Sequence, residues 1–240
     1  MAQSLPKRMS QQTILAMKKI LILLCFIIIP IITSSSIVSS EKTICMFEDY
    51  KGSIEYFKQQ ERICSQVERE AFVKNVLRLE RYGVNMKKYL YKMGQLESAH
   101  NYLAVNRLGY VGKYQFSVYV VNQLVDIGRV SSSNVPVTRD YILSSTYYQE
   151  TVMAALTRHN YEVLRRYGLM SFVGKRVNGV LTTKEGLLAA AHLLGPYAVK
   201  HYFKTGGSLK PIRLRNGVLI RKKDANGTSI IDYMKEFQNT

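Results

Sequence analysis

The sequence contains no tryptophan and only five prolines among its 240 residues, and its 17 acidic side chains number half of its 34 basic ones. The scarcity of proline and the lack of any fixed-period self-similarity exclude a proline-rich linker and a repeat array. An apolar fraction of 47% is enough for a packed core and excludes wholesale disorder. The length suits one domain with a targeting segment before it.

The shortage of acidic residues leaves a formal net charge of +17 at pH 7. A charge of this size favours an anionic partner, such as nucleic acid, anionic lipid or the acidic polymers of a bacterial envelope, without choosing among them. The cations are spread along the chain, and the short run at 221–223 is expected to be a solvated loop.

The N-terminal region has the pattern of an export signal. Basic residues 18–19 precede an apolar run at 20–32, which is followed by small polar residues at 33–40. Cleavage before Glu41 is predicted, and the mature protein is expected in the periplasm or cell envelope. The alternative is that residues 20–32 stay as a membrane anchor, although the run is short for a span and Pro30 interrupts it.

Cysteine is also scarce, with three residues in the chain. Cys25 lies inside the apolar run and would leave with a cleaved signal. Cys45 and Cys64 remain. They could form a disulfide with each other or stay as two free thiols, and the sequence does not decide between these alternatives. No cluster of cysteine and histidine has metal-ligand spacing, so neither a metal nor another cofactor is expected.

The periodicity of apolar residues predicts a mainly α, lysozyme-like single domain with a small β-hairpin. Residues 1–40 form the N-terminal extension and signal, 41–84 an N-terminal helical segment, and 85–240 the catalytic domain. Thr182 or Thr183, and Thr228 or Ser229, are candidate N-caps. Expected helices span 53–82, 85–96, 113–127, 139–167 (one or two helices), 183–203 with a break at Gly195-Pro196, and 230–237; the hairpin is expected within 209–223.

Glu97 ends the second of these helices, beside apolar Leu96, and a glycine-containing loop follows it. Packing a glutamate against apolar neighbours disfavours the charged form of its side chain, which is how a general acid keeps a proton near neutral pH. Beyond the loop, Tyr110, Tyr114 and Gln115 offer aromatic faces and an amide to a sugar. These features suit a general acid at Glu97 beside side chains that can contact a sugar.

The stretch Glu97-Ser98, Ala104-Val105-Asn106 and Gly109-Tyr-Val-Gly-Lys-Tyr-Gln115 resembles the lytic transglycosylases of the lysozyme-like superfamily. Those enzymes carry Glu-Ser, then Ala-Val-Ser or Ala-Val-Asn, then Gly-x-x-Gly-x-x-Gln. The resemblance implies that Glu97 is the catalytic acid and base, that Ser98 positions the substrate or the acid, and that Gln115 lies in the glycan cleft. Asn106, Tyr110, Tyr114 and His192 are the other expected substrate-binding residues.

Three departures accompany this resemblance. Lys113-Tyr114 replaces the usual Leu-Met, and Ala99-His100 replaces the glycines that often follow Glu-Ser. The Ala-Tyr-Asn motif of the family is not evident, and its nearest counterpart in position is 190–195, which contains His192. The segments 186–193, 206–207 and 224–228 also resemble a second branch of cell-wall glycosidases, so the likeness spans roughly residues 85–237.

The expected reaction is lytic cleavage of peptidoglycan strands between MurNAc and GlcNAc, a route that needs one glutamate and no second carboxylate. A hydrolytic muramidase would need a second carboxylate, for which Asp126, Asp140 and Glu150 are candidates. A non-catalytic envelope protein, either a glycan-binding module or a secretion-system scaffold, is the alternative from another class. A nucleic-acid partner suits the charge but not the export signal.

Overall fold

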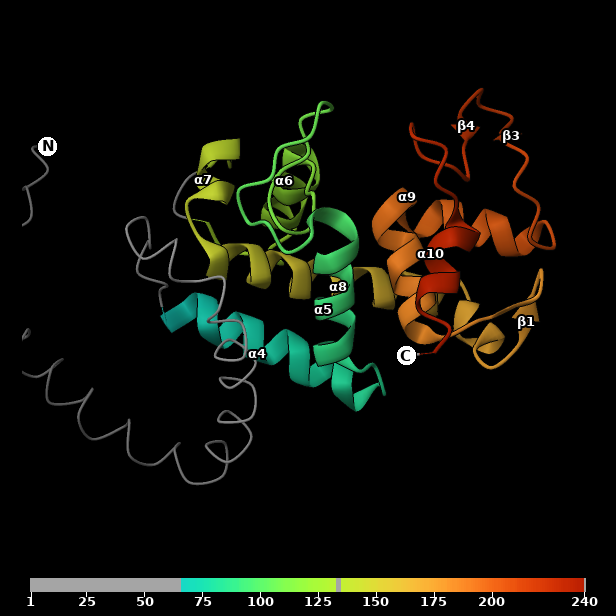
Figure 1. The fold of residues 1–240 in the computed structure, drawn as a ribbon, viewed down its shortest axis with the longest axis horizontal. Helices are drawn as coiled ribbons and strands as arrows, with labels where there is room; N and C mark the ends of the chain where they lie inside the picture. The colour runs from blue at the N-terminus through green and yellow to red at the C-terminus, as the bar shows by residue number, and fades with distance from the viewer. Residues whose placement is uncertain (1–65, 133–134, 240) are drawn as a thin grey trace, which may run out of the picture. The chain divides into compact units, whose positions relative to one another are not determined.

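The computed structural model describes residues 66–132 and 135–239, which belong to one compact unit, Glu55–Thr240. The predicted signal segment, Cys45, Cys64 and the start of the helix expected from residue 53 lie outside the described residues. The described chain has seven α-helices and two small hairpins (Figure 1), so a mainly helical chain with a small β element is confirmed. The helices are α4 (Gln66–Arg81), α5 (Met86–Ser98), α6 (Val118–Asp126), α7 (Arg139–Leu143), α8 (Thr146–Arg166), α9 (Lys184–Lys204) and α10 (Ile230–Glu236), with a 3-10 turn, η3 (Leu169–Phe172).

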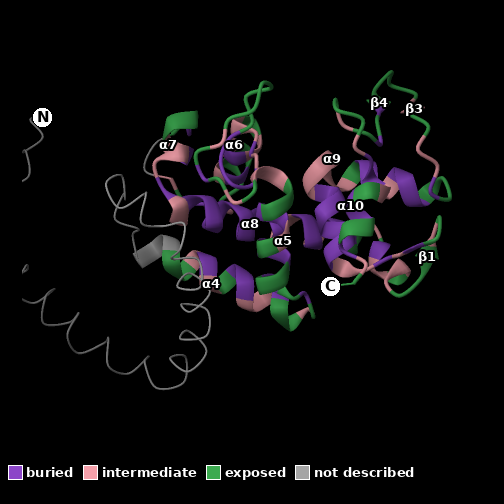
Figure 2. Ribbon diagram, in the orientation of Figure 1, coloured by how far each residue is buried: buried purple, intermediate pink, exposed green. Residues whose placement is uncertain are grey.

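The core is built around α8, whose 21 residues include 14 that are buried. Helices α4, α6, α7 and α9 all pack against α8, which is therefore drawn mostly purple in Figure 2. Helix α10 packs on α9. The buried face of α8 contains the polar side chains of Gln149 and Glu150, which is unusual for a central helix and bears on the site below.

Serine and threonine caps begin four of the helices, two of them at predicted positions. The side chain of Thr183 accepts a hydrogen bond from Gly186 N at the start of α9, whereas Thr182 is buried. Ser229 begins α10 and forms a capping box with Asp232. In each case a side-chain oxygen satisfies a main-chain N–H that has no partner within the helix. Thr138 and Ser145 cap α7 and α8 in the same way.

The helix expected from Lys113 instead begins at Val118, five residues later. Residues 113–116 form a turn in which Gln115 has a φ of +49°, and the side chains of Lys113 and Tyr114 are completely buried. The prediction was wrong because the N–H of Lys113 donates to Gln149 Oε1 (2.8 Å) and the main chains of Val111 and Phe116 pair. Tertiary partners thus replace the hydrogen bonds of a helix.

Helix α9 is interrupted where Gly195-Pro196 predicts a break. Gly195 has φ 79° and ψ 153°, which a side chain would disfavour. Pro196 lacks an N–H and disfavours helical conformation in the residue before it. The chain therefore continues in a new direction after the break.

Two antiparallel hairpins complete the fold. The first pairs β1 (Arg176–Val177) with β2 (Val180–Leu181). The second pairs β3 (Ile212–Arg213) with β4 (Leu219–Ile220) around Asn216-Gly217, which confirms the predicted hairpin. Lys222, just after β4, is buried rather than solvated as expected. Its Nζ donates to Thr205 Oγ1 (2.7 Å) and to Ser208 O (2.6 Å), and these bonds tie the hairpin to the end of α9.

Candidate active site

Glu97 is the next-to-last residue of α5, and its side chain is 12% exposed. The helix starts at Asn85, whose side chain accepts from Lys88 N, and ends at Ala99, which adopts the left-handed conformation. The main chain then turns away through His100, also at positive φ. The end of α5 therefore places a carboxyl group that is mostly shielded from water but still reachable from outside.

Tyr233 of α10 is the direct partner of this carboxyl group. Its hydroxyl donates to Glu97 Oε1 at 2.7 Å. Burial raises the pKa of the Tyr233 phenol, and the nearby Glu97 carboxylate raises it further. The phenol therefore keeps its proton near neutral pH and stays a hydrogen-bond donor to Glu97.

The ring of His192, on α9, approaches the same carboxylate oxygen, Glu97 Oε1. Its Nε2 is 2.9 Å from the main-chain oxygen of Tyr114 and 3.7 Å from Glu97 Oε1. Because a carbonyl oxygen only accepts hydrogen bonds, Nε2 must carry the hydrogen. Nδ1 is buried and has no hydrogen-bond partner among the described residues.

A buried polar network lies behind the Tyr114 carbonyl. Lys113 Nζ and the hydroxyls of Tyr102 and Tyr114 each donate to the carboxylate of Glu150 at 2.7 Å. The side chain of Lys113 is completely buried, so the ion pair with Glu150 lies out of water. This network fixes the turn at 113–116. This turn positions His192, because the Tyr114 carbonyl accepts a hydrogen bond from the His192 ring.

Gln149 fixes the same turn from the neighbouring position of α8. Its Oε1 accepts from Lys113 N, and its Nε2 donates to the main-chain oxygens of Tyr102 and Ile142. Gly112 has a φ of +78°, and a Cβ at this position would overlap the Gln149 side chain. The glycine therefore serves close packing within the protein.

The three carboxylates predicted as second catalytic groups do not share the setting of Glu97. The carboxylate of Glu150 is paired with Lys113 and Tyr114 in the buried network. Asp126 on α6 and Asp140 on α7 are exposed. Glu185, another buried carboxylate, accepts from the main-chain N–H of Asn85 at 2.8 Å. Glu97 therefore stands apart as a shielded carboxylate whose contacts are a phenol and an imidazole.

The other predicted site residues divide into two groups. Ser98 Oγ donates to Lys113 O (2.8 Å), and Gln115 Nε2 donates to Gly112 O (2.9 Å), so both brace the turn beside Glu97. Tyr114 contributes its carbonyl to this site. Its ring is buried, which corrects the expectation of an aromatic face for sugar.

Asn106 and Tyr110 lie farther along the loop and are exposed. The Asn106 side chain accepts from Leu108 N and Tyr110 N and so shapes the loop. Arg107 in the same loop donates to Asn226 Oδ1 (3.2 Å), which joins this loop to the one that precedes α10. Tyr110 keeps an accessible ring and remains a candidate for contact with a sugar.

The sequence did not indicate that Tyr233 contacts Glu97. It also did not indicate that Lys113 and Glu150 pair in a buried network. The signal for Tyr233 was weak: it lies on a capped amphipathic helix, one residue after the capping Asp232. Nothing local links it to Glu97, because 136 residues separate them.

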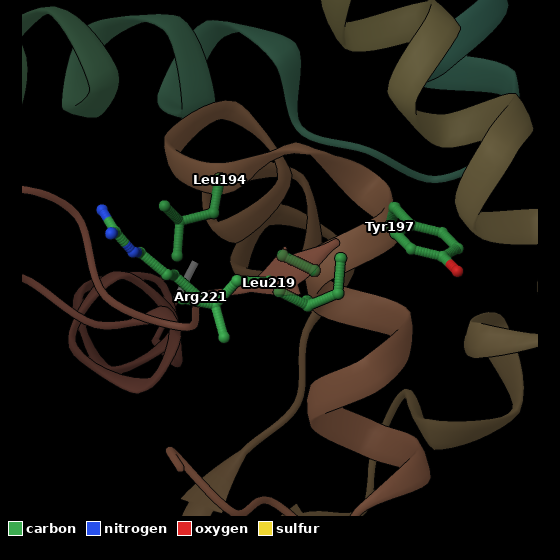
Figure 3. Close-up of a pocket in the computed structure, with 6 residues that line it drawn as sticks. Leu194, Tyr197, Leu219 and Arg221 are labelled. Carbon is green, nitrogen blue, oxygen red and sulfur yellow. The ribbon is translucent and has the colours of Figure 1, made fainter. Parts of the chain in front are cut away.

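A pocket of about 380 Å³ opens elsewhere, between α9 and β4 (Figure 3). Leu219 lies between Leu194 and Tyr197 in this view, and the guanidinium of Arg221 is on the side away from the ring of Tyr197. Its lining is Leu194, Tyr197, Ala198, Leu219, Ile220 and Arg221.

Within the described residues, no three histidine, cysteine, aspartate or glutamate side chains gather closely enough to bind a metal ion. No described helix combines the length and the apolar character that crossing a membrane requires. No family model, curated protein or solved structure matches this chain.

Proposed function

We propose that this protein is an exported lytic transglycosylase with a lysozyme-like fold, which cleaves the glycan strands of bacterial peptidoglycan with Glu97 as acid and then base. The observation that carries the proposal is the setting of Glu97: a carboxyl group at a helix end, 12% exposed and bound by a phenol that keeps its proton. Glu-Ser and the Gly-x-x-Gly-x-x-Gln pattern at 109–115 support the same assignment.

The contacts of Glu97 suggest different roles for its two carboxyl oxygens. Oε1 accepts from Tyr233, so Oε2 is the oxygen that would carry the transferable proton. In the first step this proton moves to the glycosidic oxygen as the bond to the anomeric carbon of the muramic acid breaks. The C6 hydroxyl of the same sugar then bonds to that carbon and returns its proton to Glu97. The products are a 1,6-anhydro end and a free hydroxyl, and no water is consumed.

A single-carboxylate route is favoured over two-carboxylate hydrolysis by the positions of the alternatives. Hydrolysis needs a second carboxylate to act on water or on the sugar. Glu150 is neutralised by Lys113, and Asp126 and Asp140 are exposed side chains on other helices.

The test is digestion of purified murein, followed by mass analysis of the products. The proposal expects anhydro ends from the parent protein. Reducing ends would identify a muramidase, and the absence of any product would favour a non-catalytic envelope protein.

Glu97→Gln keeps the size of the side chain but removes the transferable proton, and we expect lysis to fall by about 10²–10⁴-fold. Asp126→Asn is the matched control, since it removes an exposed carboxylate from another helix. Circular dichroism establishes that both variants fold. Lysis by Glu97→Gln at the parental rate would refute the assignment.

A further inference from the structure

The C-terminal part of the chain carries an unbalanced charge. Residues 186–223 contain eight lysines and arginines and no acidic side chain, whereas residues 66–185 contain 17 basic and nine acidic ones. Four of the eight, at 213, 215, 221 and 223, lie on or beside the β3–β4 hairpin and are exposed. Within the described residues, Arg213, Arg215 and Arg221 form no ion pair. These three arginines therefore present positive charge that no ion pair within the described residues neutralises.

Exposed apolar side chains lie among these arginines. Val218 is 49% exposed and Leu219 is 39% exposed. In the hairpin register Leu219 pairs with Arg213, and Ile212 pairs with Ile220, which is buried. Because neighbours along a strand alternate between faces, Arg213 and Leu219 lie on one face of the hairpin and Ile212 and Ile220 on the other. Leu219 is partly exposed and also borders the pocket beside α9.

Hydrogen bonds fix the hairpin at its base and at its tip. Buried Lys222 ties its base to Thr205 and Ser208 at the end of α9. At its tip, Leu214 N donates to Val218 O (2.8 Å), Gly217 N donates to Leu214 O, and Gly217 has a φ of +81°. This is a three-residue loop with glycine in the left-handed position. The apolar pocket of Figure 3 lies directly beside β4.

We propose that this hairpin surface, defined by Arg213, Arg215, Val218, Leu219 and Arg221, docks on an anionic phospholipid bilayer. The arginines would pair with lipid phosphates while Val218 and Leu219 enter the interfacial region. Cations alone would suit any polyanion, including nucleic acid or an acidic wall polymer. Exposed valine and leucine between them add an apolar contact that a bilayer provides and a hydrated polymer does not. The proposal goes beyond the glycan-cleaving function and does not depend on it.

The absence of tryptophan permits a local test in the full-length chain. Val218→Trp introduces a single tryptophan at the tip of the hairpin, and Tyr119→Trp places one at an exposed position on α6 as the control. Each variant is mixed with vesicles of phosphatidylcholine alone or with added phosphatidylglycerol. A local reporter is needed because the N-terminal apolar segment could by itself bind the chain to vesicles.

With the anionic vesicles we expect the emission of the tryptophan at 218 to shift to shorter wavelength and to be quenched by brominated lipid. The tryptophan at 119 should show neither effect. Changing Arg213, Arg215 and Arg221 to glutamine should weaken the response on the order of 100-fold, since each cation near an anionic surface contributes about fivefold. The charge-matched control, glutamine at Lys74, Arg165 and Arg166, should keep it, because these are exposed cations elsewhere.

Three results would overturn the proposal. The first is a tryptophan at 218 that stays unshifted and unquenched on anionic vesicles. The second is a response to soluble polyphosphate equal to that on vesicles, which would identify a polyanion site. The third is a response to murein fragments in place of vesicles, which would make the hairpin part of the glycan site and leave the proposed function intact.

Discussion

The phenol of Tyr233 donates a 2.7 Å hydrogen bond to Oε1 of Glu97, although 136 residues separate the two in the chain. Helix α10 supplies the phenol and α5 the carboxyl group, so the contact exists only when α10 has packed in place. Helix α10 therefore supplies the hydrogen-bond donor to the proposed acid, Glu97.

Tyr233→Phe should lower the rate of murein lysis about 10- to 150-fold while leaving the fold intact. The substitution keeps the ring but removes the hydrogen bond to Glu97, and such a bond is worth about 1.5–3 kcal/mol in the steps where the carboxylate is charged. Initial rates from turbidity of murein suspensions measure the effect, beside circular dichroism. Tyr119→Phe, on the exposed face of α6, serves as the control and should keep the parental rate. An unchanged rate for Tyr233→Phe would show that the phenol does not support the acid.

His192→Phe tests whether the imidazole N–H matters to Glu97. Phenylalanine preserves an aromatic ring but cannot bond the Tyr114 carbonyl, so we expect lysis to fall about fivefold, the value of one hydrogen bond of about 1 kcal/mol. Nitrogen-15 NMR of the parent should find the hydrogen on Nε2. His159→Phe, a histidine on α8, is the matched control. A hydrogen found on Nδ1 in the parent would contradict the geometry described above.

The buried tyrosines predict a loss of stability at alkaline pH. Burial raises the pKa of the phenols of Tyr89 and Tyr233, and the charge of Glu97 adds to both shifts. Below pH about 10 these phenols are neutral in both states, so their contribution to stability is fully present. Above it the unfolded chain loses their protons first, and the free energy of unfolding falls by about 1.4 kcal/mol per pH unit for each tyrosine.

Urea unfolding at several pH values above 9 would measure this slope. The slope should be shallower in Tyr233→Phe and in Tyr89→Phe than in the parent. Tyr119→Phe, which changes an exposed ring, should leave it unaltered. Equal slopes in all four proteins would mean that the two phenols ionise alike in the folded and unfolded states.

The Lys113–Glu150 pair should show strong coupling in unfolding experiments. Glu150→Gln leaves a lysine charge buried without its counter-charge, which costs about 3–5 kcal/mol. Adding Lys113→Met removes that charge and should restore much of the loss, since an apolar replacement of a buried pair is often tolerated. A double-mutant cycle from urea unfolding measures the coupling. Additive losses would indicate that the two groups act independently in the core.

The buried position of Glu150 also changes the choice of controls for catalysis. From the sequence, Glu150 is a candidate second carboxylate, so Glu150→Gln would be a natural comparison with Glu97→Gln. Because Glu150 lies in the buried network, that variant would lose stability for reasons unrelated to catalysis. Asp126, which is exposed, is the better control.

Much of the helical framework could be predicted because its signals are local. Capping by Thr183 and Ser229, the end of α5 near Glu97 and the break at Gly195-Pro196 depend on atoms within about four residues of one another. The choice of Glu97 likewise depends on the adjacent Glu-Ser pair and the short motif that follows it. Each prediction of a cap or a break needs only the geometry of one turn.

By itself, the sequence determined the mainly helical character, several helix caps and breaks, and the choice of Glu97 as the candidate acid. Only the tertiary structure decided that Lys113 and Lys222 are buried and that Tyr233 and His192 converge on Glu97. The partners of these side chains lie 11 to 136 residues away, as with Lys113 and Tyr102 or Tyr233 and Glu97. A buried lysine is stable only beside its acceptors, and packing of separate helices creates that proximity.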